Sequence, residues 1–187
     1  MKNKELKDLD DSSLWIMMTK GNRSALELLY SKHYDSLYYY GRRYSQDVTL
    51  IEDCIQDIFI GIFNNNQLKP VQYVQAYLLR SLKNLLLKHL SILPNYYLEE
   101  ITFDISIEDS RLTGAFQKDD EALQISKDLI KAYEKLTDKQ KNAIYLRYIK
   151  DMSYHEIAEA LNINVQSAQN VVARTLIKLK NMMPLLF

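Results

Sequence analysis

The sequence predicts an all-α fold of two small helical domains joined by an acidic linker. Its 187 residues include only four glycines and three prolines, whereas turn-rich β folds and glycine-rich phosphate loops depend on these residues. Apolar residues recur at intervals of three and four in several stretches, which is the period of an amphipathic helix. Hydrophobic residues make up 47% of the chain and charged residues 26%, so a core can be buried and whole-chain disorder is excluded.

The formal net charge is zero, but the charges are unevenly distributed. Residues 95–122 carry two Lys or Arg against eight Asp or Glu, whereas residues 1–94 carry 12 against 10 and residues 123–187 carry 10 against 6. The acidic segment has no sustained apolar period, so we interpret it as a linker between domains at 1–94 and 123–187. It is either a solvated loop with short helical turns or a segment whose charge suits a basic channel in a partner.

Two helices open the N-terminal domain. Asp11 or Ser12 can cap a short helix through residue 18, and Ser24 can cap the next, which runs to about residue 44. Six of the 14 tyrosines fall between Tyr30 and Tyr44, and we expect them to pack between helices with their hydroxyls at the surface. The apolar run at 14–18 is too short for a secretory signal or a membrane span, so we expect no membrane insertion.

A third helix is predicted over residues 48–63, with one apolar and one polar face. The apolar stripe consists of Ile51, Cys54, Ile55, Ile58, Phe59 and Ile62. The opposite face carries Glu52, Asp53, Gln56 and Asp57. A cysteine on an apolar stripe is more often a core residue than a nucleophile, and a single cysteine fits a reducing compartment.

A polar loop at 64–70 and a long helix at 71–89 complete this domain. The helix combines basic, amide and aromatic side chains: Tyr73, Tyr77, Arg80, Lys83, Asn84 and Lys88. Cations can contact phosphates while rings stack on unpaired bases, so this combination suits a nucleic-acid strand. The alternative is an ordinary amphipathic helix with a solvated basic face.

The C-terminal domain predicts a helix-turn-helix. Capping boxes begin at Thr137 and Ser153, Asn162 stands where the turn needs a left-handed residue, and Asn164 can cap a last helix to about residue 182. We expect Ala158, Ile163, Ala168, Val172, Leu176 and Leu179 to face inward. The outward face of the last helix carries short or amide-bearing side chains suited to base edges, with Lys178 and Lys180 beyond them for phosphates. These outward residues are Gln166, Ser167, Gln169, Asn170, Ala173 and Arg174.

The order of these motifs resembles that of the extracytoplasmic-function (ECF) sigma factors of RNA polymerase. Residues 136–179 are similar to sigma region four, above all at 146–148, 152–158 and 172–176. The N-terminal domain resembles sigma region two: Asp53-x-x-Gln56-Asp57-x-Phe59 is similar to its polymerase-binding helix, and Ala76-Tyr77-Leu78 with Arg80-x-x-x-Asn84 to its promoter-melting helix. The tyrosine-rich helices favour the versions common in Bacteroidetes.

The resemblance implies a role for each motif. A monomer would bind core RNA polymerase through the β′ and β subunits, thread its linker through a basic channel, and be held by an anti-sigma factor that is often membrane-anchored. The polymerase-binding residues would be Asp53, Gln56, Asp57 and Phe59. The minus-ten element of promoter DNA would be melted and held by Asn64, Asn65, Asn66, Tyr77, Arg80, Lys83, Asn84 and Lys88. The minus-thirty-five element would be read as duplex by His155, Gln166, Ser167, Gln169, Asn170, Arg174 and Lys178.

Two departures from the family pattern concern the last helix. Gln169 and Val171 stand where Arg or Lys is frequent, which implies fewer phosphate contacts and a shallower salt dependence. Asn162 replaces the customary turn glycine.

An enzyme is disfavoured by the sequence. The histidines His33, His89 and His155 lie far apart, and no metal-binding or phosphate-loop motif is present. We therefore expect a cytoplasmic protein with no catalytic residues, metal or cofactor. The alternatives are a conventional helix-turn-helix regulator that binds duplex DNA as a dimer, and a helical adaptor that binds only protein.

Overall fold

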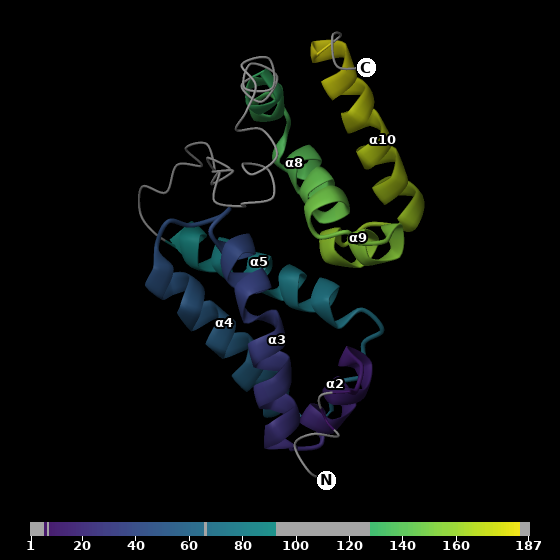
Figure 1. The fold of residues 1–187 in the computed structure, drawn as a ribbon. Helices are drawn as coiled ribbons and strands as arrows, with labels where there is room; N and C mark the ends of the chain where they lie inside the picture. Colours follow the sequence, from purple (N-terminus) through teal and green to yellow (C-terminus); the bar gives the residue numbers. More distant parts are fainter. Residues whose placement is uncertain (1–5, 7, 66, 93–127, 184–187) are drawn as a thin grey trace, which may run out of the picture. The chain divides into compact units, whose positions relative to one another are not determined.

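The computed structural model describes residues 6, 8–65, 67–92 and 128–183, and these form two compact units. Unit 1 comprises the described residues up to 92, and unit 2 comprises residues 128–183. Both units are helical, and the described residues contain no strand, as predicted (Figure 1). The predicted linker at 95–122 lies outside the described residues. No described helix is both long and apolar enough to cross a membrane.

Unit 1 is a four-helix arrangement. Its helices are α2 (Asp11–Thr19), α3 (Arg23–Gly41), α4 (Val48–Phe63) and α5 (Val74–Ile92). Aspartate or asparagine caps the first three: Asp10 accepts from the Ser13 amide, Asn22 from the Ala25 amide, and Asp47 from the Leu50 amide.

Two of the predicted caps and one predicted helix start are wrong. Asp10, and not Asp11 or Ser12, caps α2. Gly21 turns the chain with a φ of 87°, so that Asn22 reaches the cap position of α3 before Ser24 does. The last helix begins at Val74, three residues later than predicted.

The core of unit 1 collects large apolar side chains from all four helices. The fully buried ones are Trp15, Met18, Leu29, Leu37, Tyr40, Ile51, Ile55, Leu78, Leu79, Leu82 and Leu86. Trp15 meets the edge of Tyr77 at 5.1 Å between ring centres, which joins α2 to α5. Gly41 allows α3 and α4 to approach, because a Cβ built there would lie 2.7 Å from Ile51 Cγ2.

The tyrosines of α3 have three different environments. Tyr40 is fully buried, and its hydroxyl accepts a hydrogen bond of 3.0 Å from Tyr44, so the expectation of a surface hydroxyl is wrong for this residue. Tyr34 is half-buried and donates to Glu52 of α4 at 2.9 Å, which raises the pKa of Tyr34 to about 12. Tyr39 is 56% exposed. The tyrosines therefore pack α3 against its neighbours but leave one ring in solvent.

Unit 2 contains the predicted helix-turn-helix. Its described elements after residues 128–134, which are helical, are α8 (Asp138–Ile144), the π-helix η1 (Tyr145–Ile149), α9 (Tyr154–Leu161) and α10 (Val165–Met182). Both capping boxes form, Asn162 adopts the left-handed conformation with φ 53°, and Asn164 caps α10. These predictions are confirmed.

The inward face of α10 differs from the prediction at one turn. Leu176 is 36% exposed, whereas Thr175 is fully buried. Steps of four, three and four residues from Ala168 to Leu179 place position 175 inward. The Thr175 hydroxyl donates to the Val171 carbonyl at 2.7 Å, so its burial leaves no polar group unpaired.

Candidate functional site

The exposed face of α4 is an acidic stripe with an apolar end. Asp53, Gln56, Asp57 and Ile60 recur at steps of three, one and three residues, so they share one side of the helix, and all four are exposed. Ile60 is 54% exposed and was missed by sequence reasoning, although its position continues the polar stripe by one turn. We define these four residues as the α4 stripe. Two carboxylates beside an exposed isoleucine suit a partner that is basic around an apolar contact.

The opposite side of α4 anchors the stripe to the core. Phe59, which the sequence pattern grouped with the polymerase-binding residues, is 2% exposed and meets Tyr30 of α3 edge-on at 5.2 Å. Its ring can therefore orient α4 but is not part of the exposed stripe. Cys54 is also buried, and burial, with the charges of Asp57 and Asp53, raises the pKa of its thiol to about 11. A protonated buried thiol is a core group and a poor nucleophile.

The loop after α4 is polar and exposed. Asn64 and Asn65 both lie at the surface, and Asn66 lies outside the described residues. The Asn65 side chain accepts from the Gln67 amide at 3.1 Å, which closes a local turn. The side-chain oxygen of Asn65 therefore shapes the loop, and Asn64 is exposed beside it.

The predicted strand-binding residues of α5 differ in exposure. Asn84 and Lys88 are exposed, whereas Tyr77, Arg80 and Lys83 are half-buried. Tyr77 packs on the α2 tryptophan, and the Arg80 guanidinium lies 5.7 Å from the Tyr77 ring centre. This placement favours Tyr77 as a packing residue that orients Arg80, and it leaves Asn84 and Lys88 as the most accessible polar groups of the set.

The outward face of α10 presents amides and one cation. Gln166, Gln169, Asn170 and Arg174 are exposed, and Ser167 is half-buried. Gln166 and Asn170, one turn apart, are joined by a hydrogen bond of 3.2 Å. His155 of the preceding helix α9 is also exposed. Residues 166–174 include no carboxylate, so this face has no negative side chain that would repel DNA.

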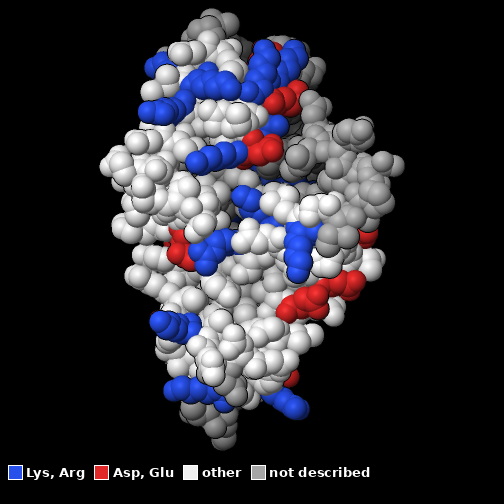
Figure 2. Space-filling view, turned by 180° about the vertical axis from the view of Figure 1, so that it is seen from behind, with Lys and Arg blue, Asp and Glu red and all other residues white. Residues whose placement is uncertain are grey.

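Lys178 is bound within unit 2. Its ammonium donates to the Lys135 carbonyl at 2.8 Å and lies 3.4 Å from Gln140 Oε1. It therefore ties α10 to the chain at the start of α8, and a phosphate would have to compete with these contacts. Lys and Arg side chains nevertheless gather over the part of unit 2 seen in Figure 2, where their charge would attract a polyanion.

Arg147 of η1 is a positioning residue that sequence reasoning missed. Its guanidinium donates to the Met152 carbonyl at 2.8 Å and lies 4.9 Å from the Tyr154 ring centre. These contacts hold the turn between η1 and α9, where Asp151 has a left-handed φ of 51°. The only sequence signal was its place in the Leu146-Arg147-Tyr148 run.

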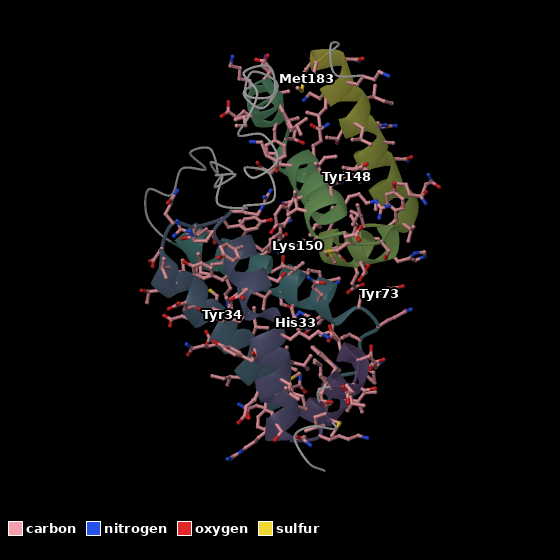
Figure 3. All side chains as sticks on the ribbon, in the orientation of Figure 1. His33, Tyr34, Tyr73, Tyr148, Lys150 and Met183 are labelled. Atoms are coloured by element: carbon pink, nitrogen blue, oxygen red, sulfur yellow. The ribbon has the colours of Figure 1, made fainter. Side chains whose placement is uncertain are left out.

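The only buried histidine among the described residues is in an ion-pair cluster between α2 and α3. His33 lies among the packed helices of unit 1 (Figure 3), with its Nε2 2.9 Å from Asp11, and Lys32 Nζ lies 2.6 Å from the same carboxylate. Contact with His33, and then with Lys32, holds the pKa of Asp11 at about 2. These groups join two helices, and the described residues contain no cluster of three or more potential metal ligands.

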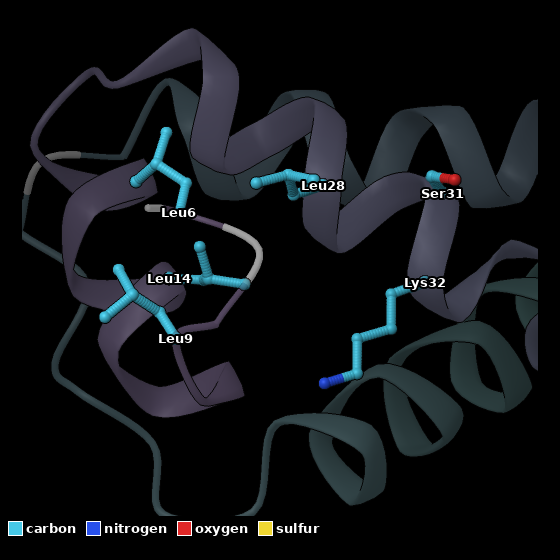
Figure 4. A pocket seen from close by; sticks show the side chains of 6 residues that line it. All are labelled: Leu6, Leu9, Leu14, Leu28, Ser31 and Lys32. Atoms are coloured by element: carbon cyan, nitrogen blue, oxygen red, sulfur yellow. The ribbon is translucent and has the colours of Figure 1, made fainter. Parts of the chain in front are cut away.

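A pocket next to this cluster is lined mostly by leucines. Figure 4 shows its lining: Leu6, Leu9, Leu14, Leu28, Ser31 and Lys32. The ammonium of Lys32 is already paired with Asp11. The pocket therefore offers apolar contact and no catalytic group.

Comparison with known proteins assigns both units. Residues 29–91 match the family model described as Sigma-70 region 2, and residues 126–179 match the one described as Sigma-70, region 4. The two models together cover more than half of the chain. The fold is also similar to a solved structure described as that of CnrH in complex with the cytosolic domain of CnrY, with a TM-score of 0.60 and 22% sequence identity over 93% of this chain and 97% of that one. No curated protein matches the sequence.

Proposed function

The chain belongs to the sigma-70 family of RNA polymerase sigma factors. We propose that three surfaces carry its functions: the α4 stripe, the loop after α4 together with the exposed groups of α5, and the outward face of α10. As a family member with regions 2 and 4, it binds core polymerase and promoter DNA and directs transcription initiation. We further propose that it belongs to the extracytoplasmic-function group, as the sequence predicts, with regions 2 and 4 as its matched parts. A conventional helix-turn-helix regulator would account for unit 2, but it would have no need of region 2.

The α4 stripe is the proposed polymerase contact, and it is the observation that carries the assignment. Asp53, Gln56 and Asp57 are the exposed members of the predicted polymerase-binding motif, and Ile60 extends the surface by one turn. A basic helical surface of the β′ subunit would face the carboxylates, and the isoleucine would fill an apolar position beside them. Charges at the rim steer association, and the apolar side chain slows dissociation.

The loop after α4 and the exposed groups of α5 are the proposed contacts of the minus-ten element. A base flipped out of the duplex costs a few kcal/mol of stacking and pairing. Asn64 and the neighbouring loop would bind such a base. Asn84 and Lys88 would contact the adjacent strand, with Arg80 and Lys83 supporting them from half-buried positions.

The outward face of α10 is the proposed reader of the minus-thirty-five element. Its exposed amides and Arg174 face the major groove in this assignment, with His155 of α9 close to the backbone. Because Gln169 replaces a frequent cation and Lys178 is held within unit 2, we expect a shallow salt dependence of binding.

The remaining partners follow from the family and from the structural similarity. We propose that the acidic segment 95–122 passes through a basic channel of the polymerase, and that the protein works as a cytoplasmic monomer and not as an enzyme. CnrH was solved in complex with the cytosolic domain of CnrY. By analogy, we propose that a protein partner, an anti-sigma factor, binds this chain and keeps it inactive until initiation is required.

A charge reversal on the α4 stripe tests the assignment. Asp57→Lys places a cation against the proposed basic surface, so retention of core polymerase on the immobilised protein should fall about tenfold or more. Asp35→Lys makes the same change at an exposed position of α3 and serves as the control. Equal retention of polymerase by both variants would remove the stripe from the interface.

A further inference from the structure

Two amide side chains on the exposed face of α10 form a pair. Gln166 and Asn170 lie one helical turn apart, and Gln166 Nε2 donates a hydrogen bond of 3.2 Å to Asn170 Oδ1. Both residues are exposed, so water could satisfy each amide, and the bond contributes little to helix stability. Its main consequence is geometric, because each side chain restricts the rotamers of the other.

The bond between the paired amides leaves one carbonyl and one amino group that take no part in it. The bond uses one hydrogen of the Gln166 amide and the carbonyl of Asn170. Gln166 Oε1 is then the remaining acceptor, and Asn170 Nδ2 is the remaining donor. If the bond ran in the opposite direction, the two residues would exchange roles, but one carbonyl and one amino group would still lie outside the bond. The combination is therefore independent of how the amides are oriented.

Adenine is the base whose major-groove edge matches this combination. Its N7 accepts beside an N6 amino group that donates, whereas guanine offers two acceptors, thymine an acceptor and a methyl group, and cytosine a donor. We infer that the Gln166–Asn170 pair reads one adenine of the upstream promoter element. Asn170 donates to N7 and Gln166 accepts from N6. This inference rests on the proposed role of α10 as the reader of duplex DNA.

The surroundings of the pair suit this reading. Ala173, close to Asn170 along the exposed face, is too small to block a base edge, and Arg174, one turn beyond Asn170, can contact a neighbouring phosphate. The helix itself is held at both ends: Asn164 accepts from the Ser167 amide at 2.7 Å, and Lys178 binds the chain before α8. A fixed helix with a restricted amide pair loses little entropy when it binds a base.

Removal of one atom from the DNA tests the inference. Holoenzyme assembled from the full chain and core polymerase first selects its preferred upstream element from a randomised pool. Each adenine of that element is then replaced, one at a time, by 7-deazaadenine, which lacks the N7 acceptor. At one adenine, promoter affinity should fall about fivefold or more, the lower end of the discrimination of a bidentate amide contact.

Variants of the chain assign that loss to the pair. In Asn170→Ala the ratio of affinities for the adenine and 7-deazaadenine promoters should approach one, and in Gln166→Ala it should shrink. Asn181→Ala removes an exposed amide near the other end of the same helix, and the ratio at this adenine should persist. If the holoenzyme prefers an upstream sequence but no adenine responds to the replacement, the inference is wrong and the proposed role of α10 stands. If no upstream sequence is preferred, both fail.

Discussion

Because α3 and α4 approach closely at Gly41, we expect replacement of a glycine by alanine to have opposite effects on stability at Gly41 and at Gly61. A Cβ at position 41 would lie 2.7 Å from Cγ2 and 3.4 Å from Cγ1 of Ile51, and 3.5 Å from Leu82 Cδ2. Ile51 is fully buried, and its Cγ2 is attached to a branched Cβ, so the side chain cannot swing away freely. At Gly61 of α4 a Cβ would meet nothing within 4 Å.

The two substitutions to alanine should therefore move stability in opposite directions. Overpacking costs about 1–3 kcal/mol, and removal of a glycine from a helix returns about 0.5–1 kcal/mol. Gly41→Ala should thus lower the free energy of unfolding of unit 1 by about 1 kcal/mol, the difference between the middle of each range. Gly61→Ala should raise it by about 0.5–1 kcal/mol.

The single tryptophan makes the measurement specific to unit 1. Trp15 is fully buried in this unit, so its fluorescence during urea unfolding reports α2–α5 alone. With a urea slope of about 1–2 kcal/mol per molar, the midpoints of the two variants should differ by about 1 M or more. If Gly41→Ala is as stable as the wild type, α3 and α4 do not meet as closely as described. The packing that positions α4 and its stripe would then differ from the structure.

Three further outcomes are expected. Ile60→Ala should weaken polymerase binding about tenfold, and it should leave the Trp15 unfolding curve unchanged because Ile60 is 54% exposed in the free protein. Binding equal to that of the wild type would show that the stripe ends at residue 57. The pKa of Asp11 is lowered from 3.8 to about 2 by His33 and then Lys32, so the contribution of this cluster to the stability of unit 1 should be complete above pH 4 and lost as the pH falls toward 2. In Asp11→Asn that part of the pH dependence of unfolding should be absent, and a pH profile of stability equal to that of the wild type would count against the cluster. Asn162→Ala should destabilise α9 and α10 by about 1 kcal/mol because alanine is strained in the left-handed region, whereas Asn162→Gly should not destabilise them. Hydrogen exchange of the α9 amides measures the stability of both variants, and equal protection in the two would refute the strain.

Local sequence patterns predicted the helix-turn-helix of unit 2 well. The capping boxes at Thr137 and Ser153 formed because both partners of each box lie within four residues of chain. The left-handed turn at Asn162 is also decided locally, since few residues tolerate that conformation. Patterns of this range need no knowledge of how the helices pack.

Features set by tertiary packing were less accessible. Hydrophobicity favoured Leu176 as a core residue, but helix contacts buried Thr175, whose hydroxyl bonds to its own helix. Ser24 and Asn22 are comparable caps, and the turn at Gly21 decided between them. Phe59 is a different case, because the helical period alone predicts its place on the buried side of α4, whereas the family pattern grouped it with its polar neighbours.

The site was predictable to a similar extent. The motifs identified the helices that carry the proposed site, and the exposure of Asn84 and Asn170 follows from the helical period. Contacts between distant residues did not follow, among them the binding of Lys178 to the Lys135 carbonyl and the packing of Trp15 against Tyr77. Each depends on side-chain reach across two elements, which a single sequence does not specify.

Transcription from a pool of promoter fragments tests the central assignment most directly. Core RNA polymerase is supplied with the fragments alone, with the wild-type chain, and with Asp57→Lys or Arg174→Ala. We expect new transcription start sites with the wild-type chain. With Asp57→Lys the use of all of them should fall strongly, and with Arg174→Ala only the use of those that have a preferred upstream element should fall. Start sites that are the same with and without the chain would contradict the account.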